Sequence, residues 1–276
     1  MRLSFYTYSY LDKLQLPVAQ TLERIARTGY SGIDVSGTYG NSDDPKSFDV
    51  ARRRLIRATA ERLNLRVEAI ITHAQLTDTL ADPNRETLDL NGSIDLAADL
   101  RAEVVTFHMG GTPKGAHREK LWKQVVGEIQ NAADHGAARH VALAVDGIWP
   151  VWLVDSPDAL QQLFDDVDHQ NFGVNLDPSY LTLIDFDPAR FVDRFHTRIV
   201  HAHLKDHLGS YPEWTHHIPG QGEMDYVPVL AALRRRKFDG SLAVECFTTM
   251  KLEEACRVGF TAMTKAAREA RVEFGS

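Results

Sequence analysis

Short apolar runs alternate along this chain with longer segments in which apolar residues recur at helical spacing. The eight apolar runs are RLSFYTY, GIDV, RVEAIIT, EVVTFHM, HVALAV, FGVNL, RIVHAHL and SLAVECF. Runs of this length, bounded by polar or turn-forming residues, are typical of strands buried in a parallel sheet. We therefore expect eight strands.

The segments between the runs have the pattern of amphipathic helices. In VAQTLERIA and LWKQVVGEIQNAA the apolar residues fall on one helical face. Typical helix starts are either Asp158 or Ser156-Pro157 before ALQQLF, and Asp187-Pro188 before ARFVDRF. Strands alternating with helices require a parallel sheet, and eight right-handed crossovers close most simply into a (β/α)8 TIM barrel. An open doubly wound sheet is the alternative, but no GxGxxG or GxxxxGK[ST] motif supports a nucleotide-binding version.

Composition narrows the class of protein. A chain of 276 residues with 43% hydrophobic content can form one large core, so we expect a single domain over residues 1–276. The net charge of −7 does not suit nucleic acid binding. The two cysteines, Cys246 and Cys256, do not indicate a disulfide framework, and no leader or membrane-spanning run is recognisable. These features predict a cytoplasmic protein without membrane contact.

Four of the apolar runs end on side chains that can bind a metal. VALAVD ends at Asp146, FGVNLD at Asp177 and LAVE at Glu245, while IVHAHLKD carries His203 near its end. Each has an alternative explanation, because the two aspartates precede glycine or proline and could open turns, and the glutamate could form an ion pair. Together, however, three carboxylates and an imidazole at adjacent strand ends predict a site for a divalent cation. His201 shares a face with His203 but lies deeper, where we expect a hydrogen-bonded core residue.

The predicted ligand set is rich in oxygen and contains no thiolate. It suits Mn²⁺ best, with Mg²⁺, Co²⁺ or Zn²⁺ as alternatives. One such ion could hold two adjacent oxygens of a sugar, polarise its carbonyl and stabilise an enediolate while the carboxylates move protons.

The segments VNLDPSYL, HAHLKD, PGQGEMDYVPVLAAL and GSLAVECF together resemble the sugar phosphate isomerase/epimerase family, also called the xylose isomerase-like barrel superfamily. The resemblance extends over nearly the whole chain and implies an eight-stranded barrel with one divalent metal. It maps the metal onto Asp146, Asp177, His203 and Glu245, and makes Asp146 and Glu245 the acid/base pair. Two positions depart from the family pattern: Asp146 replaces the usual glutamate, and Tyr180 stands where histidine is frequent.

Further candidates lie at other strand ends and in the following loops. His73 and His108 end strands three and four and are expected to hydrogen-bond substrate hydroxyls, with a purely structural hydrogen-bonded role as the alternative. Lys205 shares a face with His203 and could neutralise an enediolate oxygen, although an ion pair with Asp206 or another acid explains it equally well. The aromatic candidates for substrate binding are Trp149, Trp214 and Tyr180; for the tryptophans, packing between loops is the alternative.

The stretch over residues 206–225 is predicted to be an irregular loop above the barrel mouth. Its Tyr211, Trp214, His216 and His217 are too rich in rings for a disordered linker, so we expect it to contact substrate or the pocket of a neighbouring subunit. Whether the chain forms a homo-oligomer stays open.

These observations favour a metal-dependent isomerase or epimerase acting on a small sugar or keto-sugar through an enediolate. A lyase or dehydratase that expels a β-substituent at the same site is the first alternative. A phosphodiesterase or endonuclease fits less well because the chain is acidic, and a non-catalytic barrel is the remaining alternative. The expected partner is a small carbohydrate.

Overall fold

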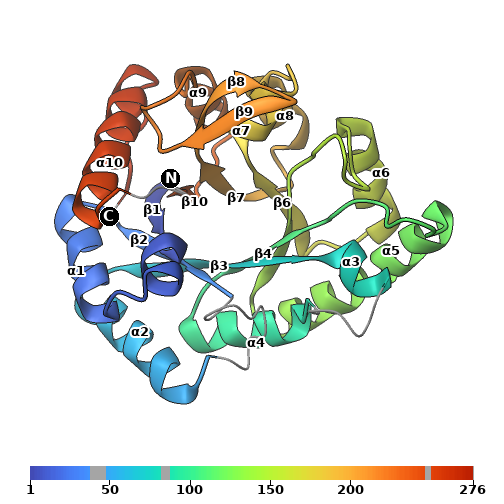
Figure 1. Cartoon of the computed structure of the whole chain (residues 1–276), viewed down its shortest axis with the longest axis horizontal. Helices are drawn as coiled ribbons and strands as arrows, with labels where there is room; N and C mark the ends of the chain where they lie inside the picture. The colour runs from blue at the N-terminus through green and yellow to red at the C-terminus, as the bar shows by residue number, and fades with distance from the viewer. Residues whose placement is uncertain (38–47, 82–87, 246–249, 276) are drawn as a thin grey trace.

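The eight predicted strands form a closed parallel barrel (Figure 1). The computed structural model describes residues 1–37, 48–81, 88–245 and 250–275. Around the barrel the strands follow the order β1-β10-β7-β6-β5-β4-β3-β2. Their bounds are β1 Arg2–Tyr6, β2 Gly32–Ser36, β3 Arg66–Gln75, β4 Val104–His108, β5 Ala142–Asp146, β6 Phe172–Leu176, β7 Ile199–Leu204 and β10 Ser241–Val244.

Helices surround the barrel and bury their apolar faces against it (Figure 1). The helices are η1 Ser9–Lys13, which is a π-helix, α1 Val18–Thr28, α2 Val50–Arg62, α3 Leu76–Ala81, α4 Leu90–Leu100, α5 Arg118–Ala137, α6 Pro157–Val167, α7 Pro178–Leu183, α8 Pro188–Phe195, α9 Val227–Arg235 and α10 Leu252–Glu269. Leu22 and Ile25 of α1 and Val125 and Ile129 of α5 are fully buried, as the helical spacing predicts. The main hydrophobic core includes all four of these side chains.

Two predicted helix starts are confirmed in their chemical detail. The side chain of Ser156 accepts a hydrogen bond from the backbone amide of Ala159 at the start of α6. Asp187 accepts from the amide of Ala189 at the start of α8. In both helices proline occupies the first turn, where it sacrifices no helical hydrogen bond.

The stretch after β7 is irregular only from residue 218 onward, so the prediction was wrong for residues 206–217. Residues 206–217 form an antiparallel hairpin of β8 (Asp206–Ser210) and β9 (Glu213–His217), drawn in orange in Figure 1. The two strands pair only with each other, and β8 lies against α7 at one edge of the barrel. Beyond Asp206 and His207 most residues of the hairpin are exposed. Its sequence therefore lacks the alternation of apolar and polar residues by which a half-buried strand is recognised.

Two smaller expectations concern the cysteines and the membrane. Cys256 is buried on α10, whereas Cys246 lies outside the described residues. Within the described ranges, no helix combines the length and apolarity that crossing a bilayer would require.

Candidate active site

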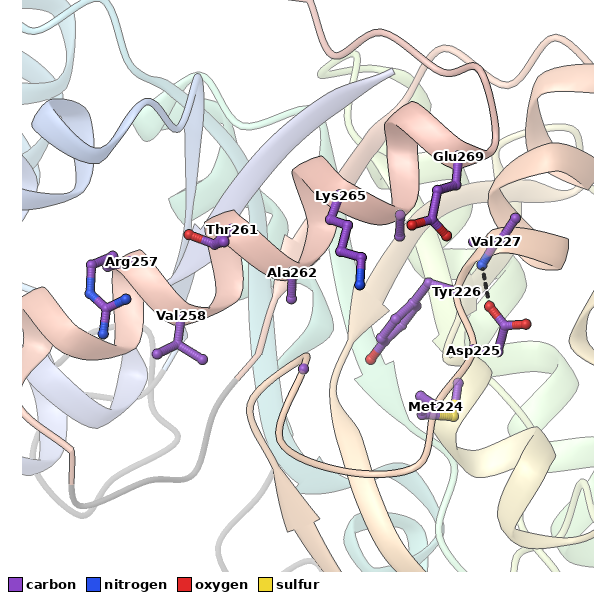
Figure 2. Close-up of a pocket in the computed structure, with 12 residues that line it drawn as sticks. Met224, Asp225, Tyr226, Val227, Arg257, Val258, Thr261, Ala262, Lys265 and Glu269 are labelled. Carbon is purple, nitrogen blue, oxygen red and sulfur yellow. Dashed lines mark hydrogen bonds between the residues drawn. The ribbon is translucent and has the colours of Figure 1, made fainter.

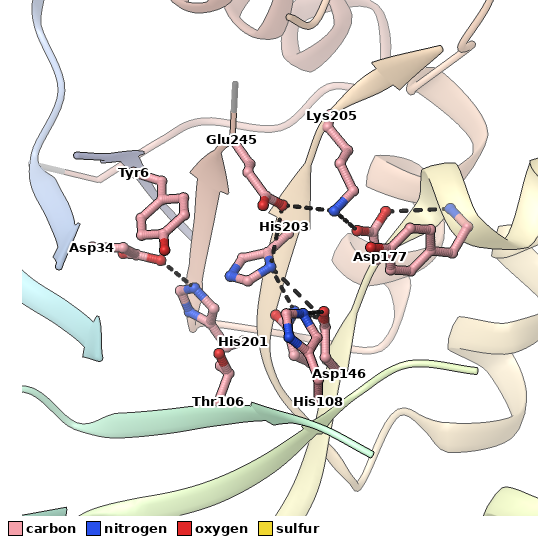
Figure 3. Close-up of polar contacts among 12 residues, drawn as sticks. Tyr6, Asp34, Thr106, His108, Asp146, Asp177, His201, His203, Lys205 and Glu245 are labelled. Carbon is pink, nitrogen blue, oxygen red and sulfur yellow. Dashed lines mark hydrogen bonds and ion pairs between the residues drawn. The ribbon is translucent and has the colours of Figure 1, made fainter. Parts of the chain in front are cut away.

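Four strand ends meet in one buried cluster of charged and polar side chains (Figure 3). Asp146 ends β5, Asp177 follows β6, His203 lies near the end of β7 and Glu245 follows β10. These residues are only 1–4% exposed. Buried carboxylates are unfavourable without a positive partner, so the electrostatic balance of the cluster decides what it can bind.

Lys205 supplies one positive charge to the cluster. Its Nζ lies 2.8 Å from Asp177 Oδ2 and 2.8 Å from Glu245 Oε2, and 4.2 Å from the centre of the Tyr180 ring. Burial alone would lower the pKa of Lys205, but the charges of Asp177 and Glu245 raise it well above its usual value. Lys205 is therefore a protonated bridge between two of the three carboxylates.

His108 is paired with the third carboxylate. Its Nε2 lies 2.9 Å from Asp146 Oδ2. Burial would lower the pKa of His108, but the hydrogen bond and charge of Asp146 raise it. Burial likewise opposes ionisation of Asp146, yet the same contact and the charge of His108 lower its pKa below the usual range. The two residues form a pair in which the ionised forms stabilise each other.

His203 is neutral and turns Nδ1 toward the carboxylates. Nδ1 lies 3.4 Å from Glu245 Oε2 and 3.8 Å from Asp146 Oδ1, and burial lowers the pKa of His203 to about 4. The Asn175 amide donates to Nδ1 at 2.9 Å and also donates to Asp146 Oδ1. Because Nδ1 accepts a hydrogen bond, the neutral ring carries its proton on Nε2. The lone pair of Nδ1 is thus directed into the cluster.

The two carboxylate oxygens of Asp177 have different partners. Oδ1 accepts hydrogen bonds from the Ser179 amide at 2.9 Å and from the Ser179 hydroxyl at 2.6 Å, which fixes the start of α7. Oδ2 faces the Lys205 ammonium, with Nζ 2.8 Å away. Burial raises the pKa of Asp177, and the charges of Asp146 and Glu245 raise it further despite Lys205. The cluster therefore holds more negative than positive charge.

This arrangement fits a divalent cation. Asp146, Asp177 and His203 each offer one ligand atom, and the three atoms lie within 4.8 Å of one another. Glu245 is not part of that group, although its Oε2 lies 3.4 Å from His203 Nδ1. Two carboxylate oxygens, a neutral imidazole and surplus negative charge suit an ion that prefers oxygen and nitrogen ligands. A cation bound there would share Asp177 with Lys205.

His73, expected to bind substrate, is held by a tyrosine. Tyr6 Oη lies 2.6 Å from His73 Nε2. Burial raises the pKa of Tyr6 well above its usual value, so the phenol keeps its proton. Burial also lowers the pKa of His73 to about 3, and the charge of His108 contributes in the same direction. His73 is consequently a neutral ring beside the charged cluster.

The aromatic candidates pack against one another. The Trp149 ring centre lies 5.0 Å from that of Tyr180 and 5.1 Å from that of Trp214, and Trp149 is 8% exposed. Trp152 continues the group, with ring centres 5.6 Å from His108 and 6.0 Å from Tyr180. The alternative expected for the tryptophans, packing against neighbouring side chains, is therefore present. Tyr180 also contacts Lys205, so the aromatic group joins the charged cluster directly.

Asp206 binds backbone amides of the following loop and does not pair with Lys205. Its carboxylate accepts hydrogen bonds from the backbone amides of Gly220, Gly222 and Met224, and from that of His207. A Cβ at Gly222 would collide with this carboxylate and with the His207 carbonyl, which explains the glycine in PGQGEMD. Of the two alternatives for Lys205, the ion pair with an acid is present, but its partners are Asp177 and Glu245.

Two polar residues near the cluster, Asn175 and Asp34, were not among the candidates predicted from the sequence. Asn175 shares a strand face with Asp177, and a buried amide two positions before a proposed ligand was a usable signal. Asp34 on β2 binds His201 Nε2 at 2.6 Å, so His201 is the hydrogen-bonded core residue that was expected. No signal in the sequence connects Asp34 with His201, because 167 positions separate them.

A surface cavity of about 410 Å³ lies beside the site (Figure 2). It is bounded by α10 and by the segment that precedes α9, and none of its lining residues belongs to the charged cluster. Tyr226 forms part of its wall and donates its hydroxyl to the Lys205 carbonyl at 2.8 Å. The cavity therefore lies behind the backbone of β7 and is not where the strand ends converge.

Comparison with known families identifies the fold. The family model described as "Xylose isomerase-like TIM barrel" matches residues 22–268. The chain belongs to this family, as the four quoted sequence segments predicted.

Two curated relatives with named activities are similar over part of the chain. The 2-oxo-tetronate isomerase of Pectobacterium atrosepticum is 22% identical over 183 residues, 65% of this chain and 66% of that protein. The 3-dehydroshikimate dehydratase of Pseudomonas putida is 21% identical over 235 residues, 83% of this chain but 36% of that protein. The chain thus spans two thirds or less of the length of these relatives. Homologues of this kind include isomerases and a dehydratase, which makes an enzyme the expected class.

Solved structures share the barrel at low sequence identity. The D-psicose 3-epimerase of Clostridium cellulolyticum, solved with D-tagatose, has a TM-score of 0.79 and 13% identity, covering 98% of this chain and 99% of that one. The IOLI protein, solved with a bound zinc atom, has a TM-score of 0.77 and 17% identity over 98% and 99% of the two chains. At these identities the likeness establishes the fold.

Proposed function

We propose that this member of the xylose isomerase-like family is a divalent-metal-dependent isomerase or epimerase of a small sugar or keto-sugar. One observation carries the proposal: a buried strand-end cluster with surplus carboxylates also contains a neutral imidazole whose lone pair points into it. The named activities of the isomerase relative and of the epimerase neighbour support the same reaction class.

The proposed ligands are Asp146, Asp177, His203 and Glu245. A bound divalent ion supplies Lewis acidity, which polarises a carbonyl and favours the enediolate. The oxygen-rich ligand set favours Mn²⁺, and Mg²⁺, Co²⁺ or Zn²⁺ are the alternatives. The IOLI protein, which shares this barrel, was solved with a bound zinc atom, and this supports a metal in the present chain. For Glu245 to bind the ion, its carboxylate has to contact both the ion and the Lys205 ammonium.

The residues around the ligands take the remaining roles. Glu245 transfers the proton on the carbon next to the carbonyl, and Asp146 assists chiefly as a ligand. Lys205 places its ammonium where it can stabilise negative charge on a substrate oxygen. His73, His108, Trp149, Trp214 and Tyr180 form the surfaces that hold the sugar.

Metal content is the first test of this proposal. Protein stripped with a chelator, refilled with Mn²⁺ and dialysed should contain about one ion per chain by elemental analysis, and the ion should raise the melting temperature because it binds only the folded state. The matched control is Asp193→Asn, which changes an exposed, arginine-paired carboxylate far from the cluster and should keep the ion. Wild-type protein without bound metal would disprove the proposal.

Exchange of hydrogen with solvent tests the reaction class. In D₂O with Mn²⁺ and a panel of ketoses and keto-acids, an isomerase or epimerase should introduce deuterium on the carbon next to the carbonyl. Nuclear magnetic resonance of the recovered sugar locates the label. Glu245→Gln provides the matched control, because label incorporation that persists in this variant does not pass through the proposed proton-transfer group.

A lyase is the second candidate, and the state of His108 favours it. The hydrogen bond and charge of Asp146 raise the pKa of His108 and so favour its imidazolium form, which can donate a proton to a departing β-substituent. The dehydratase relative belongs to the same reaction class. An unsaturated product together with the released substituent would identify the lyase, and His108→Gln should then slow its formation more than it slows deuterium exchange.

A further inference from the structure

A second polar pair lies inside the barrel, next to the proposed ligands and outside their set. His201 Nε2 and Asp34 Oδ2 are 2.6 Å apart, and both residues are at most 1% exposed. The other oxygen of Asp34 accepts a hydrogen bond from the Ser4 hydroxyl at 3.0 Å, and Ser4 in turn accepts one from Ser241 at 2.9 Å. The carboxylate of Asp34 is thereby fixed in orientation at both oxygens.

This pair faces the far side of His203. One ring nitrogen of His203, one of His201 and one carboxylate oxygen of Asp34 lie within 4.8 Å of one another. Figure 3 shows the ring of His203 between the two groups, with one nitrogen toward Glu245 and the other toward the side where Asp34 and His201 lie. His203 Nε2 is buried and has no hydrogen-bond partner among the described residues.

The same three residues could be taken for a second cation site, but their contacts oppose this. Asp34 Oδ2 is already bound by His201 Nε2, and Asp34 Oδ1 by Ser4. A cation would have to replace both contacts in a layer that is closed to solvent. The surplus of carboxylates lies on the other side of His203, where three acids face Lys205.

We propose that Asp34 is a positioning residue for the metal ligand His203. Its fixed negative charge favours the tautomer of His203 that carries the proton on Nε2, and this leaves the lone pair of Nδ1 directed at the cation. Ligating histidines in metal sites generally donate the N–H of the non-ligating nitrogen to a carboxylate or carbonyl, which raises the basicity of the ring. Among the described residues His203 Nε2 has no such hydrogen bond, so Asp34 acts on it through its charge. The inference rests on the proposed metal-dependent function, because Asp34 would influence metal binding only through the proposed ligand His203.

Metal affinity in Asp34→Asn is the decisive measurement. Asparagine keeps the shape of the side chain and removes its charge, so Mn²⁺ binding followed by electron paramagnetic resonance should weaken about 10- to 100-fold. Ser241→Ala is the matched control, because it removes one buried hydroxyl of the same chain of hydrogen bonds without changing the Asp34 charge; its Mn²⁺ affinity should stay at the wild-type value. Melting temperatures of each variant without metal separate loss of stability from loss of affinity.

A measurement on the wild-type chain keeps the inference testable if Asp34→Asn does not fold. In metal-free protein labelled with ¹⁵N-histidine, the shifts of His203 should report a protonated Nε2 and an unprotonated Nδ1. A protonated Nδ1 would overturn the inference, and so would wild-type Mn²⁺ affinity in folded Asp34→Asn. If wild-type protein binds no divalent metal, the proposed function fails first; if it binds metal and Asp34→Asn binds equally well, only the role of Asp34 fails.

Discussion

The two halves of the barrel mouth differ in charge. Strands β5, β6, β7 and β10 contribute Asp146, Asp177, Lys205 and Glu245, whose charges partly offset one another. Strands β1 and β3 contribute neutral groups, because burial raises the pKa of Tyr6 and lowers that of His73 to about 3. His108 on β4 lies at the boundary between the halves, as the partner of Asp146.

This difference indicates how the work at the site is divided. A sugar presents one reactive carbonyl and several neutral hydroxyls, so it needs charged groups at one end and hydrogen-bonding neutral groups along the rest. The charged half is suited to moving a proton and holding a cation, and the neutral half to orienting hydroxyl groups without attracting competing ions. Substitutions in the charged half should therefore affect the rate most, and those in the neutral half should affect stability or binding.

The largest effect is expected for Glu245→Gln. The amide keeps the size of the side chain but cannot accept the proton, so kcat should fall about 100-fold or more on a substrate identified by deuterium exchange. Glu253→Gln changes an exposed glutamate on α10 that pairs with Arg24 and serves as the control. A wild-type kcat in Glu245→Gln would show that Glu245, and with it the charged half, does not transfer the proton.

A second substitution tests whether Asp146 acts as a ligand. Asp146→Asn removes the charge that pairs with His108 and faces His203, so Mn²⁺ affinity should fall by about tenfold or more, read from the midpoint of a metal titration. Asp146→Glu restores the charge with a longer reach and should recover most of that loss. Equal affinity in both variants and wild type would show that Asp146 does not bind the ion.

The sequence predicted the charged half better than the neutral half. Asp146, Asp177, His203 and Glu245 each stand at the end of a continuous apolar run, and a parallel barrel brings such ends together whatever the details of packing. The pairing of these acids with Lys205 and His108, however, depends on side-chain distances of 2.8–2.9 Å that spacing along the chain does not determine.

Two errors show where reasoning from the sequence fails. Both strands of the hairpin β8–β9 mix exposed residues with buried or half-buried ones, and few of these are apolar, so no hydrophobic periodicity revealed the hairpin. Asp206 was weighed as a partner of Lys205 because the two are adjacent, although neighbours on a strand point to opposite sides. Its four backbone donors come mostly from residues 220–224, and such a contact between separated segments appears only in the structure.

The pH dependence of stability tests whether His73 is neutral. Its folded pKa of about 3 lies below the ordinary 6.5, so unfolding takes up a proton and stability falls as the pH drops from 6.5 toward 3. Between pH 7 and 5.5 this one group should cost about 1 kcal/mol in urea unfolding, a figure reduced for its partial exposure. His73→Gln should lose less stability over that interval, whereas the exposed His140→Gln should behave as wild type. Identical acid dependence in all three proteins would contradict a neutral His73.

The smallest effect is expected from the aromatic group of Trp149, Trp152, Tyr180 and Trp214, which contacts Lys205 in the charged half. Trp214 lies on β9 with its ring centre 5.1 Å from that of Trp149, and the hairpin that carries it is not part of the barrel. Trp214→Ala should therefore raise KM about 2- to 10-fold, the range of one lost aromatic contact, while the melting temperature stays nearly constant. Trp122→Ala removes a tryptophan of α5 whose indole binds Asp166, away from the mouth, and should leave KM unchanged. If Trp214→Ala lowers the melting temperature and leaves KM as it was, the hairpin supports the fold and does not bind the sugar.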